Sequence, residues 1–266
     1  MSDWNAERYH ELSSPQQAWG RRVLERIQPT GGERVLDLGC GTGRLTAELA
    51  RRVPEGRVIA ADQSTAMLET ASRWLRAHAP GVRLVQVDGA ALPFSRAFDA
   101  IFSNATFHWI PDHAALFRSL VTALVPGGRL VSQCGGGPNI ALLYAHADAI
   151  ARRPFFAHYF SEWTPPGNYA DVEATRRRMH AAGFVDINVW LEAAPTSFDT
   201  AAAYQEFVAT VCLRQHLSRL PSADRPSFLR EVTMLAAADD PPFTLDYWRL
   251  NIDARRPAVP AGERRP

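Results

Sequence analysis

The chain has 266 residues, a formal net charge of +1 at pH 7 and 46% hydrophobic residues. This apolar content is enough for one large buried core, and the balanced charge argues against the concentrated basic surface of nucleic-acid-binding proteins. No run of 18 apolar residues and no signal peptide is found, so we expect a cytoplasmic protein that contacts no membrane.

Cysteine spacing and residue usage add further limits. Cys40, Cys134 and Cys212 have no metal-ligand spacing, and we expect no metal site. All 29 basic residues are arginine, which with abundant Ala and Pro is typical of a G+C-rich bacterial genome. We expect one domain over residues 1–254 and a disordered Pro- and Arg-rich tail over 255–266. The sequence leaves the oligomeric state open.

The first predicted helix covers residues 9–27. Tyr9 precedes its apolar face, and Trp19 lies within the helix. Trp19 could pack on the sheet or face a ligand, and the pattern does not separate these possibilities.

The most informative motif follows at residues 35–43, which read VLDLGCGTG. Glycine at 39, 41 and 43 permits a sharp turn out of a strand and lets a ligand approach main-chain N–H groups. The spacing differs from the G-x-G-x-x-G of dinucleotide-binding proteins. Asp37 would repel a diphosphate but suits a cationic group, such as the ammonium of S-adenosylmethionine.

The second predicted strand, residues 57–62, ends in Asp62, 19 residues after Gly43. In a doubly wound fold, an acid at about this separation hydrogen-bonds to ribose hydroxyls. Asp62 could alternatively cap the helix predicted from Thr65 to Ala79, but Ser64 suits that role well. Both functions can therefore coexist.

Further strands are predicted over 82–87, 98–105 and 127–134. The first of them leads into Asp88, whose carboxylate can accept a hydrogen bond from an adenine amino group. Helical patterns separate the strands, which indicates a parallel sheet with helices on both faces. Two more strands are predicted over 187–191 and 245–254, so the predicted fold is a doubly wound, mostly parallel α/β sheet of seven strands with a helical lid over the carboxyl ends of the strands.

These motifs, in this order, resemble those of class I S-adenosylmethionine-dependent methyltransferases across about residues 30–135. The resemblance implies S-adenosylmethionine as the cofactor, with Asp37 at its methionine part, Asp62 at the ribose and Asp88 at the adenine. The cofactor-binding set that it implies is Asp37, Gly39, Cys40, Gly41, Gly43, Asp62, Gln63, Met67, Asp88, Gly89, Ala90 and Asn104.

Segments outside this core are expected to form the lid and to decide the substrate. They are residues 1–28, the aromatic-rich stretch 138–166 and two helices within 199–241. By resemblance, the N-terminal helix closes over the methionine end of the cofactor, which makes Tyr9 and Trp19 substrate-site candidates. A last strand over 245–254 is expected to insert antiparallel.

The exit of the fourth strand, residues 103–113, contains the candidate catalytic pair His108 and Trp109. It lacks the Pro-Pro-aromatic run of amino methyltransferases that act on nucleic-acid bases. Its Asn-Ala, Trp and Pro-Asp-His pattern resembles the trans-aconitate methyltransferase group, which esterifies small carboxylic acids. His108 could be a general base, a residue that orients substrate, or a structural imidazole.

A carboxylate with a pKa near ~4 is already ionised at neutral pH and needs no base, whereas a phenol near ~10 does. Arginine would bind such an acceptor in a bidentate manner. Four arginines in lid or last-strand segments are candidates, and Arg214 is the one chosen over Arg152, Arg153 and Arg249.

The leading hypothesis is therefore O-methylation of a small carboxylate. Methylation of carbon, nitrogen or a phenol is the alternative within the same class. An NAD-dependent oxidoreductase is disfavoured by Asp37 and the glycine spacing, and a non-catalytic cofactor-binding protein by the acids at 37, 62 and 88.

Overall fold

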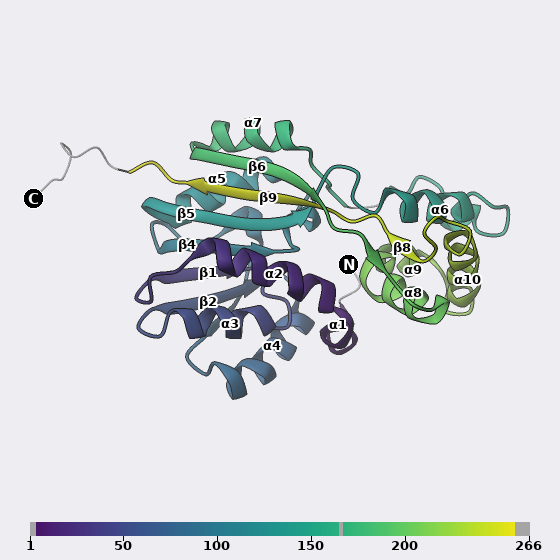
Figure 1. Ribbon diagram of the computed structural model, residues 1–266, viewed down its shortest axis with the longest axis horizontal. Helices are drawn as coiled ribbons and strands as arrows, with labels where there is room; N and C mark the ends of the chain where they lie inside the picture. The colour runs from purple at the N-terminus through teal and green to yellow at the C-terminus, as the bar shows by residue number, and fades with distance from the viewer. Residues whose placement is uncertain (1–3, 165–166, 259–266) are drawn as a thin grey trace, which may run out of the picture.

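One seven-stranded sheet runs through the protein, which the computed structural model describes over residues 4–164 and 167–258 (Figure 1). The strand order is β3-β2-β1-β4-β5-β9-β6, and only β9 runs antiparallel to its neighbours. The strands are β1 (Arg34–Leu38), β2 (Arg57–Asp62), β3 (Arg83–Gln86), β4 (Phe98–Asn104), β5 (Leu124–Gly135), β6 (Val185–Ala193) and β9 (Trp248–Arg255). The predicted fold class is confirmed.

Helices cover both faces of the sheet, because successive side chains of each strand point to opposite faces. Val35 packs in one apolar layer and Leu36 in the other. Helices α2, α3 and α4 cover the Val35 side, and α5 and α7 cover the Leu36 side. The helices are α2 (Ser14–Ile27), α3 (Arg44–Arg52), α4 (Thr65–His78), α5 (His113–Ala123) and α7 (Val172–Ala182), with the short turns η1 (Gly89–Ala91) and η2 (Phe107–Trp109).

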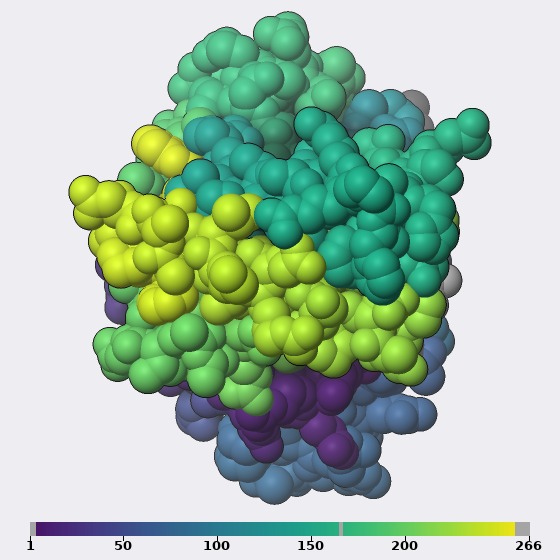
Figure 2. All heavy atoms as spheres, turned by 90° about the vertical axis from the view of Figure 1, so that its right-hand side faces the viewer, coloured from purple at the N-terminus to yellow at the C-terminus, as the bar shows by residue number. Residues whose placement is uncertain are grey.

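A second group of helices, the lid, lies beyond the carboxyl ends of the parallel strands (Figure 1). Phe156, Tyr204 and Phe228 belong to its apolar core, which is separate from both layers on the sheet. Figure 2 looks onto this end, where the lid covers the molecule above the purple N-terminal segment. The lid comprises α6 (Ala141–Ala151), η3 (Ala157–Tyr159), α8 (Ala201–Phe207), the π-helix η4 (Val208–Cys212), α9 (Arg214–Arg219) and α10 (Arg225–Ala236).

Two helices predicted as continuous are each divided. The predicted helix over 9–27 becomes α1 (Ala6–Leu12) and α2, because Pro15 lacks an N–H group and its ring crowds the preceding turn. Of the two helices predicted within 199–241, the first, expected over 200–219, becomes α8, η4 and α9, and the chain leaves helical geometry at Leu213. No described helix is both long and apolar enough to cross a membrane.

The last strand begins later than predicted. Residues of β8 (Thr244–Leu245) pair with β7 (Thr196–Ser197) in a separate two-stranded sheet, and β9 starts only at Trp248. The predicted antiparallel insertion is confirmed, since β9 pairs with β5 and β6. Arg256 donates its N–H to Gly128 O, so the predicted tail begins against the sheet. Residues 259–266 of that tail lie outside the described residues.

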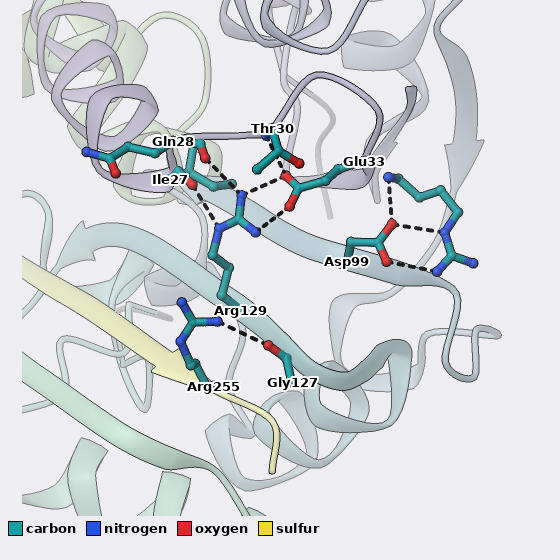
Figure 3. Close-up of polar contacts among 9 residues, drawn as sticks. Ile27, Gln28, Thr30, Glu33, Asp99, Gly127, Arg129 and Arg255 are labelled. Carbon is teal, nitrogen blue, oxygen red and sulfur yellow. Dashed lines mark hydrogen bonds and ion pairs between the residues drawn. The ribbon is translucent and has the colours of Figure 1, made fainter. Parts of the chain in front are cut away.

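A partly buried ion pair, Arg129–Glu33, fixes the start of β1 against β5 and the end of α2 (Figure 3). Arg129 donates from Nη1 and Nη2 to the two carboxylate oxygens of Glu33 at 2.8 and 2.7 Å, and from Nε to Ile27 O at 2.8 Å. The Arg129 guanidinium holds the pKa of the Glu33 carboxyl below its usual value. This network lies at the amino end of β1, at the end of the sheet opposite the lid, so it stabilises the sheet without reaching the site.

We expect Arg129→Met to lower the free energy of unfolding by about 2–4 kcal/mol, because Glu33 and the Ile27 carbonyl lose a charged donor. Urea unfolding at pH 7 measures this. The loss should shrink in acid, since a carboxyl with a depressed pKa stabilises the fold only above that pKa.

The matched control is Arg22→Met, which removes the exposed ion pair between Arg22 of helix α2 and Glu192 of β6. Arg22→Met should lower the free energy of unfolding by less than about 1 kcal/mol. An equal loss in both variants would show that the Arg129 network has no special role.

Candidate functional site

A cavity of about 370 Å³, the outer cavity, opens where β1, β2 and β4 end beneath the N-terminal segment. Carboxyl ends of parallel strands are where ligands bind in open α/β sheets. The outer cavity is lined by ten of the residues predicted for the site: Tyr9, Gly39, Gly41, Asp62, Gln63, Met67, Gly89, Asn104, Trp109 and Arg214.

The glycine loop between β1 and α3 forms one wall. Gly41 has φ +53°, and a Cβ placed on it would meet no atom within 4 Å, so this wall is open toward the cavity. Asp62 supports the loop from β2: its carboxylate accepts the N–H of Gly41 at 2.9 Å and the N–H of Ser64 at 2.9 Å. The acid thereby joins the loop to the start of α4.

Asp37 lies behind the loop and does not line the cavity. Its carboxylate is buried and accepts a hydrogen bond from Thr46 Oγ1 at 2.6 Å. Burial raises the pKa of Asp37 to about 7, despite that hydrogen bond. The free protein therefore holds a carboxyl that is only partly ionised at neutral pH, next to the predicted cofactor loop.

The other predicted cofactor residues outside the lining are Cys40, Gly43, Asp88 and Ala90. Cys40 is buried in the loop, and Asp88 is an exposed cap that accepts the N–H of Ala90 at 2.9 Å. Gly89, which lies between Asp88 and Ala90 in the sequence, does line the cavity. The structure thus presents the backbone of this turn, rather than the Asp88 side chain, as the cavity wall.

Asn104 at the end of β4 places an unused acceptor at the cavity. Its Nδ2 donates to Gln16 O at 2.9 Å, which orients the amide. Its Oδ1 is buried without a hydrogen-bond partner among the described residues. A buried acceptor of this kind is available to a donor on a ligand.

Aromatic rings from the N-terminal segment cover the outer cavity. Trp4 contacts both Tyr9 and Trp109 edge-on, with centroids 5.2 and 5.6 Å apart, and the Arg214 guanidinium lies 4.3 Å from the Trp4 ring. His10 hydrogen-bonds to Thr42 at 2.9 Å, which holds α1 against the glycine loop.

A smaller space of about 30 Å³, the inner pocket, continues from the outer cavity toward the lid. The two share four lining residues: Trp4, Tyr9, Ala105 and Trp109. The inner pocket adds His108 from β4's exit, Cys212 from the π-helix and Arg249 from β9. Trp19 lines neither space, and its ring packs 4.4 Å from the Arg249 guanidinium.

His108 is buried, and its ring is held in one orientation. Its Nδ1 accepts the N–H of Gly135 at 3.2 Å, so the proton of the neutral ring is on Nε2. Burial, together with the nearby Arg249 charge, holds the pKa of His108 well below its usual value. The neutral ring therefore has no vacant nitrogen lone pair with which to remove a proton from a substrate.

Several lining residues were not predicted for the site. Trp4 gave no periodic signal because it precedes the first helix, and Tyr169 and Tyr247 reach the site through long-range packing. Arg249, one of the four candidate arginines but not the one chosen, reaches it in the same way. Neighbours of predicted motifs could have been found by extending those motifs: they are Leu38, Ser64, Thr65, Val87, Ala105, Thr106 and Ile110.

Comparison with known protein sequences shows the family to which the chain belongs. Residues 35–128 match the family described as "Methyltransferase domain". The chain is 34% identical to the trans-aconitate 2-methyltransferase of Deinococcus radiodurans, over 85% of this chain and 87% of that protein. It is 32% identical to the protein of the same name in Methylobacterium radiotolerans, over 91% and 92%. The chain belongs to the trans-aconitate 2-methyltransferase family.

Members of this family use S-adenosylmethionine, and this chain is an S-adenosylmethionine-dependent methyltransferase. Solved structures share its fold. The YcgJ protein of Bacillus subtilis superposes with a TM-score of 0.65 at 17% identity, covering 91% of this chain and all of that one. Phosphoethanolamine N-methyltransferase 2 of Haemonchus contortus, solved with S-adenosylhomocysteine, gives 0.61 at 21% identity, over 95% and 57%.

We expect Gly41→Val to abolish binding of S-adenosylhomocysteine, because the new side chain would project into the outer cavity. Calorimetry measures the affinity. Gly31→Val is the matched control, since Gly31 also has a positive φ and open space but does not line the cavity. Binding that survives in the Gly41 variant would place the cofactor elsewhere.

We expect Asp37→Asn to stabilise the free protein by about 1–3 kcal/mol at pH 8 and to weaken S-adenosylhomocysteine binding. The folded carboxyl titrates near pH 7 and the unfolded one near 3.8, so the cost of ionisation grows between these values and is complete above pH 7. Thermal unfolding at pH 5 and 8 should therefore show the larger gain at pH 8.

The control is Asp99→Asn. Arg34 holds the pKa of the Asp99 carboxyl below its usual value, so this change should destabilise the protein at both pH values. A gain from Asp37→Asn that is the same at pH 5 and pH 8 would contradict the role given to ionisation.

Proposed function

We propose that this methyltransferase esterifies a carboxylate of a small organic acid and that the outer cavity holds the cofactor. The observation that carries the proposal is the lack of a usable base. Among the described residues that line the two spaces, His108 has no vacant lone pair, and burial raises the pKa values of Tyr9, Tyr169 and Cys212 to about 12.

Asp62 is the one carboxylate among the described residues that line the two spaces, and it accepts hydrogen bonds from two backbone N–H groups. We assign its other lone pairs to the ribose hydroxyls of the cofactor rather than to the methyl acceptor. A hydroxyl or an ammonium acceptor would have to lose a proton at this site, whereas a carboxylate is ionised beforehand. The names of the relatives support the same acceptor class, since they are trans-aconitate 2-methyltransferases.

For the cofactor, we propose that the glycine loop and Asn104 hold the methionine part, Asp62 the ribose, and the Gly89 turn with Met67 the adenine. The open wall at Gly41 and the unused Asn104 Oδ1 fit such a ligand. When bound, S-adenosylmethionine supplies an activated methyl group, so esterification of a carboxylate forms one O–C bond, breaks one C–S bond and releases no proton.

The residues of this chain then act by position. Trp4, Tyr9 and Trp109 cover the junction of the two spaces and exclude water from it. Alignment of a preformed nucleophile in a dry site can supply much of the rate without acid–base catalysis. We therefore assign Trp109, predicted as a catalytic residue, to covering and drying the junction and not to a step of the chemistry.

The direct test uses methyl-labelled S-adenosylmethionine with trans-aconitate, fumarate, crotonate, catechol and primary amines. Methyl esters release labelled methanol in alkali, whereas aryl ethers and N-methyl or C-methyl products do not. Alkali-labile label from an acid supports the proposal. Stable label from catechol or an amine, with none from the acids, would replace it with phenolic, nitrogen or carbon methylation.

We further expect kcat to be independent of pH between about 6 and 9, because the bound acceptor is ionised throughout that range. The steady-state rate at saturating cofactor and acid measures this. Cofactor affinity must be followed separately, since Asp37 titrates near pH 7 in the free protein. A kcat that rises tenfold per pH unit would indicate removal of a proton and contradict the carboxylate assignment.

A further inference from the structure

Arg249 is a buried cation in the inner pocket. It lies on β9, opposite Gly135 of β5 and Glu192 of β6, and only 2% of its surface is exposed. No described carboxylate lies within 4 Å of its guanidinium nitrogens, and its Nη2 has no hydrogen-bond partner among the described residues. Its Nε makes one long contact, 3.4 Å, with Gln133 Oε1.

Arginine does not lose its charge in proteins, so this buried cation needs compensation. Aromatic rings provide part of it: the guanidinium carbon lies 4.4 Å from the Trp19 ring centre and 5.9 Å from that of Tyr247. These rings hold the guanidinium group in place but give its Nη2 donor no hydrogen-bond acceptor. An anion that enters the inner pocket would do so.

The other polar groups of the inner pocket suit an anion. His108 presents an Nε2–H donor because its Nδ1 is engaged by Gly135, and none of the residues that line the pocket is acidic. The space of about 30 Å³ is enough for about two water molecules, and so for a single carboxylate group rather than a whole organic acid. The rest of the acid must therefore extend into the shared junction at Trp4, Tyr9, Ala105 and Trp109.

We propose that Arg249 is the specificity-determining residue of this enzyme: it holds, with His108 Nε2–H, a carboxylate of the acceptor that is not methylated. A carboxylate bound by these donors is a poor nucleophile because its lone pairs are engaged. A second carboxylate of the same molecule, in the junction, receives the methyl group. This inference rests on the proposed function and adds that productive acceptors carry at least two carboxylates.

The other arginines fit this role less well. Arg214, the one predicted, lies over the Trp4 ring at the outer cavity. Arg152 is exposed on the lid surface, with 82% of its side chain accessible, and Arg153 pairs with Glu231. Among these four arginines, only Arg249 is both buried and in the inner pocket.

The test compares fumarate with crotonate, which has the same carbon skeleton with a methyl group in place of one carboxylate, and with the monoamide of fumarate. Wild type should bind fumarate, in the presence of S-adenosylhomocysteine, about 100-fold more tightly than either analogue. Arg249→Gln should weaken fumarate binding by about 30-fold or more and reduce the preference to less than about 5-fold. Arg249→Lys, which keeps the charge, should recover part of the affinity.

In turnover, the same loss should appear mainly in KM for fumarate, with kcat changed by less than about 10-fold, because Arg249 holds the acceptor and not the methyl group. Calorimetry with S-adenosylhomocysteine and thermal unfolding should show cofactor affinity and folding unchanged in both variants. Arg255→Gln is the matched control, since Arg255 lies on the same strand and donates to Gly127 O at its other end. It should behave as wild type.

Two results would overturn the inference: crotonate bound as tightly as fumarate by wild type, or fumarate affinity unchanged in Arg249→Gln. Failure of the proposed function is seen separately, as a lack of alkali-labile methyl product from every acid. In that case calorimetric binding of fumarate still reports on the anion site, and loss of binding only in Arg249→Gln would retain Arg249 as an anion anchor without esterification.

Discussion

The pairing of Gly135 with Arg249, at the lid end of β5 and β9, is the constraint on which the inner pocket depends. A Cβ on Gly135 would lie 2.8 Å from both Asn139 Nδ2 and Tyr169 Cε1, so a larger residue would displace two pocket walls. The N–H of Gly135 donates to His108 Nδ1. One glycine thus fixes the protonated nitrogen of His108 and leaves room for the Asn139 and Tyr169 side chains that line the inner pocket beside Arg249.

Much of the fold and of the cofactor end could be predicted from the sequence because the signals there are local. The glycine loop, Asp62 and the Gly89 turn each follow directly on a strand, and parallel strands bring their carboxyl ends to one edge. The strand pattern likewise predicted the doubly wound sheet, and the resemblance to methyltransferases predicted its antiparallel last strand. What local sequence could not provide was which side chain points into the cavity, as at Asp37 and Asp88.

The acceptor end was harder to predict because distant segments build it. Arg249 reaches the inner pocket only through the pairing of β9 with β5, more than 100 residues earlier in the chain. The state of the His108 ring depends on a hydrogen bond from a residue 27 positions away. By contrast, Pro15 was a visible signal for the division of the first helix, and the helical periodicity on both sides concealed it.

Helix α2 belongs to two hydrophobic cores at once. Trp19, near its start, packs with the lid core beneath Arg249, whereas Val23, Leu24 and Ile27 pack with the layer on the sheet. Recombination between two related genes could therefore not transfer the lid as an independent unit by exchanging residues 136–247 alone. A chimaera that kept its own α2 would pack the native Trp19 against a foreign lid core, so α2 would have to come from the donor of the lid as well. Divergence of acceptor preference in this architecture then requires coordinated change at the two ends of the gene.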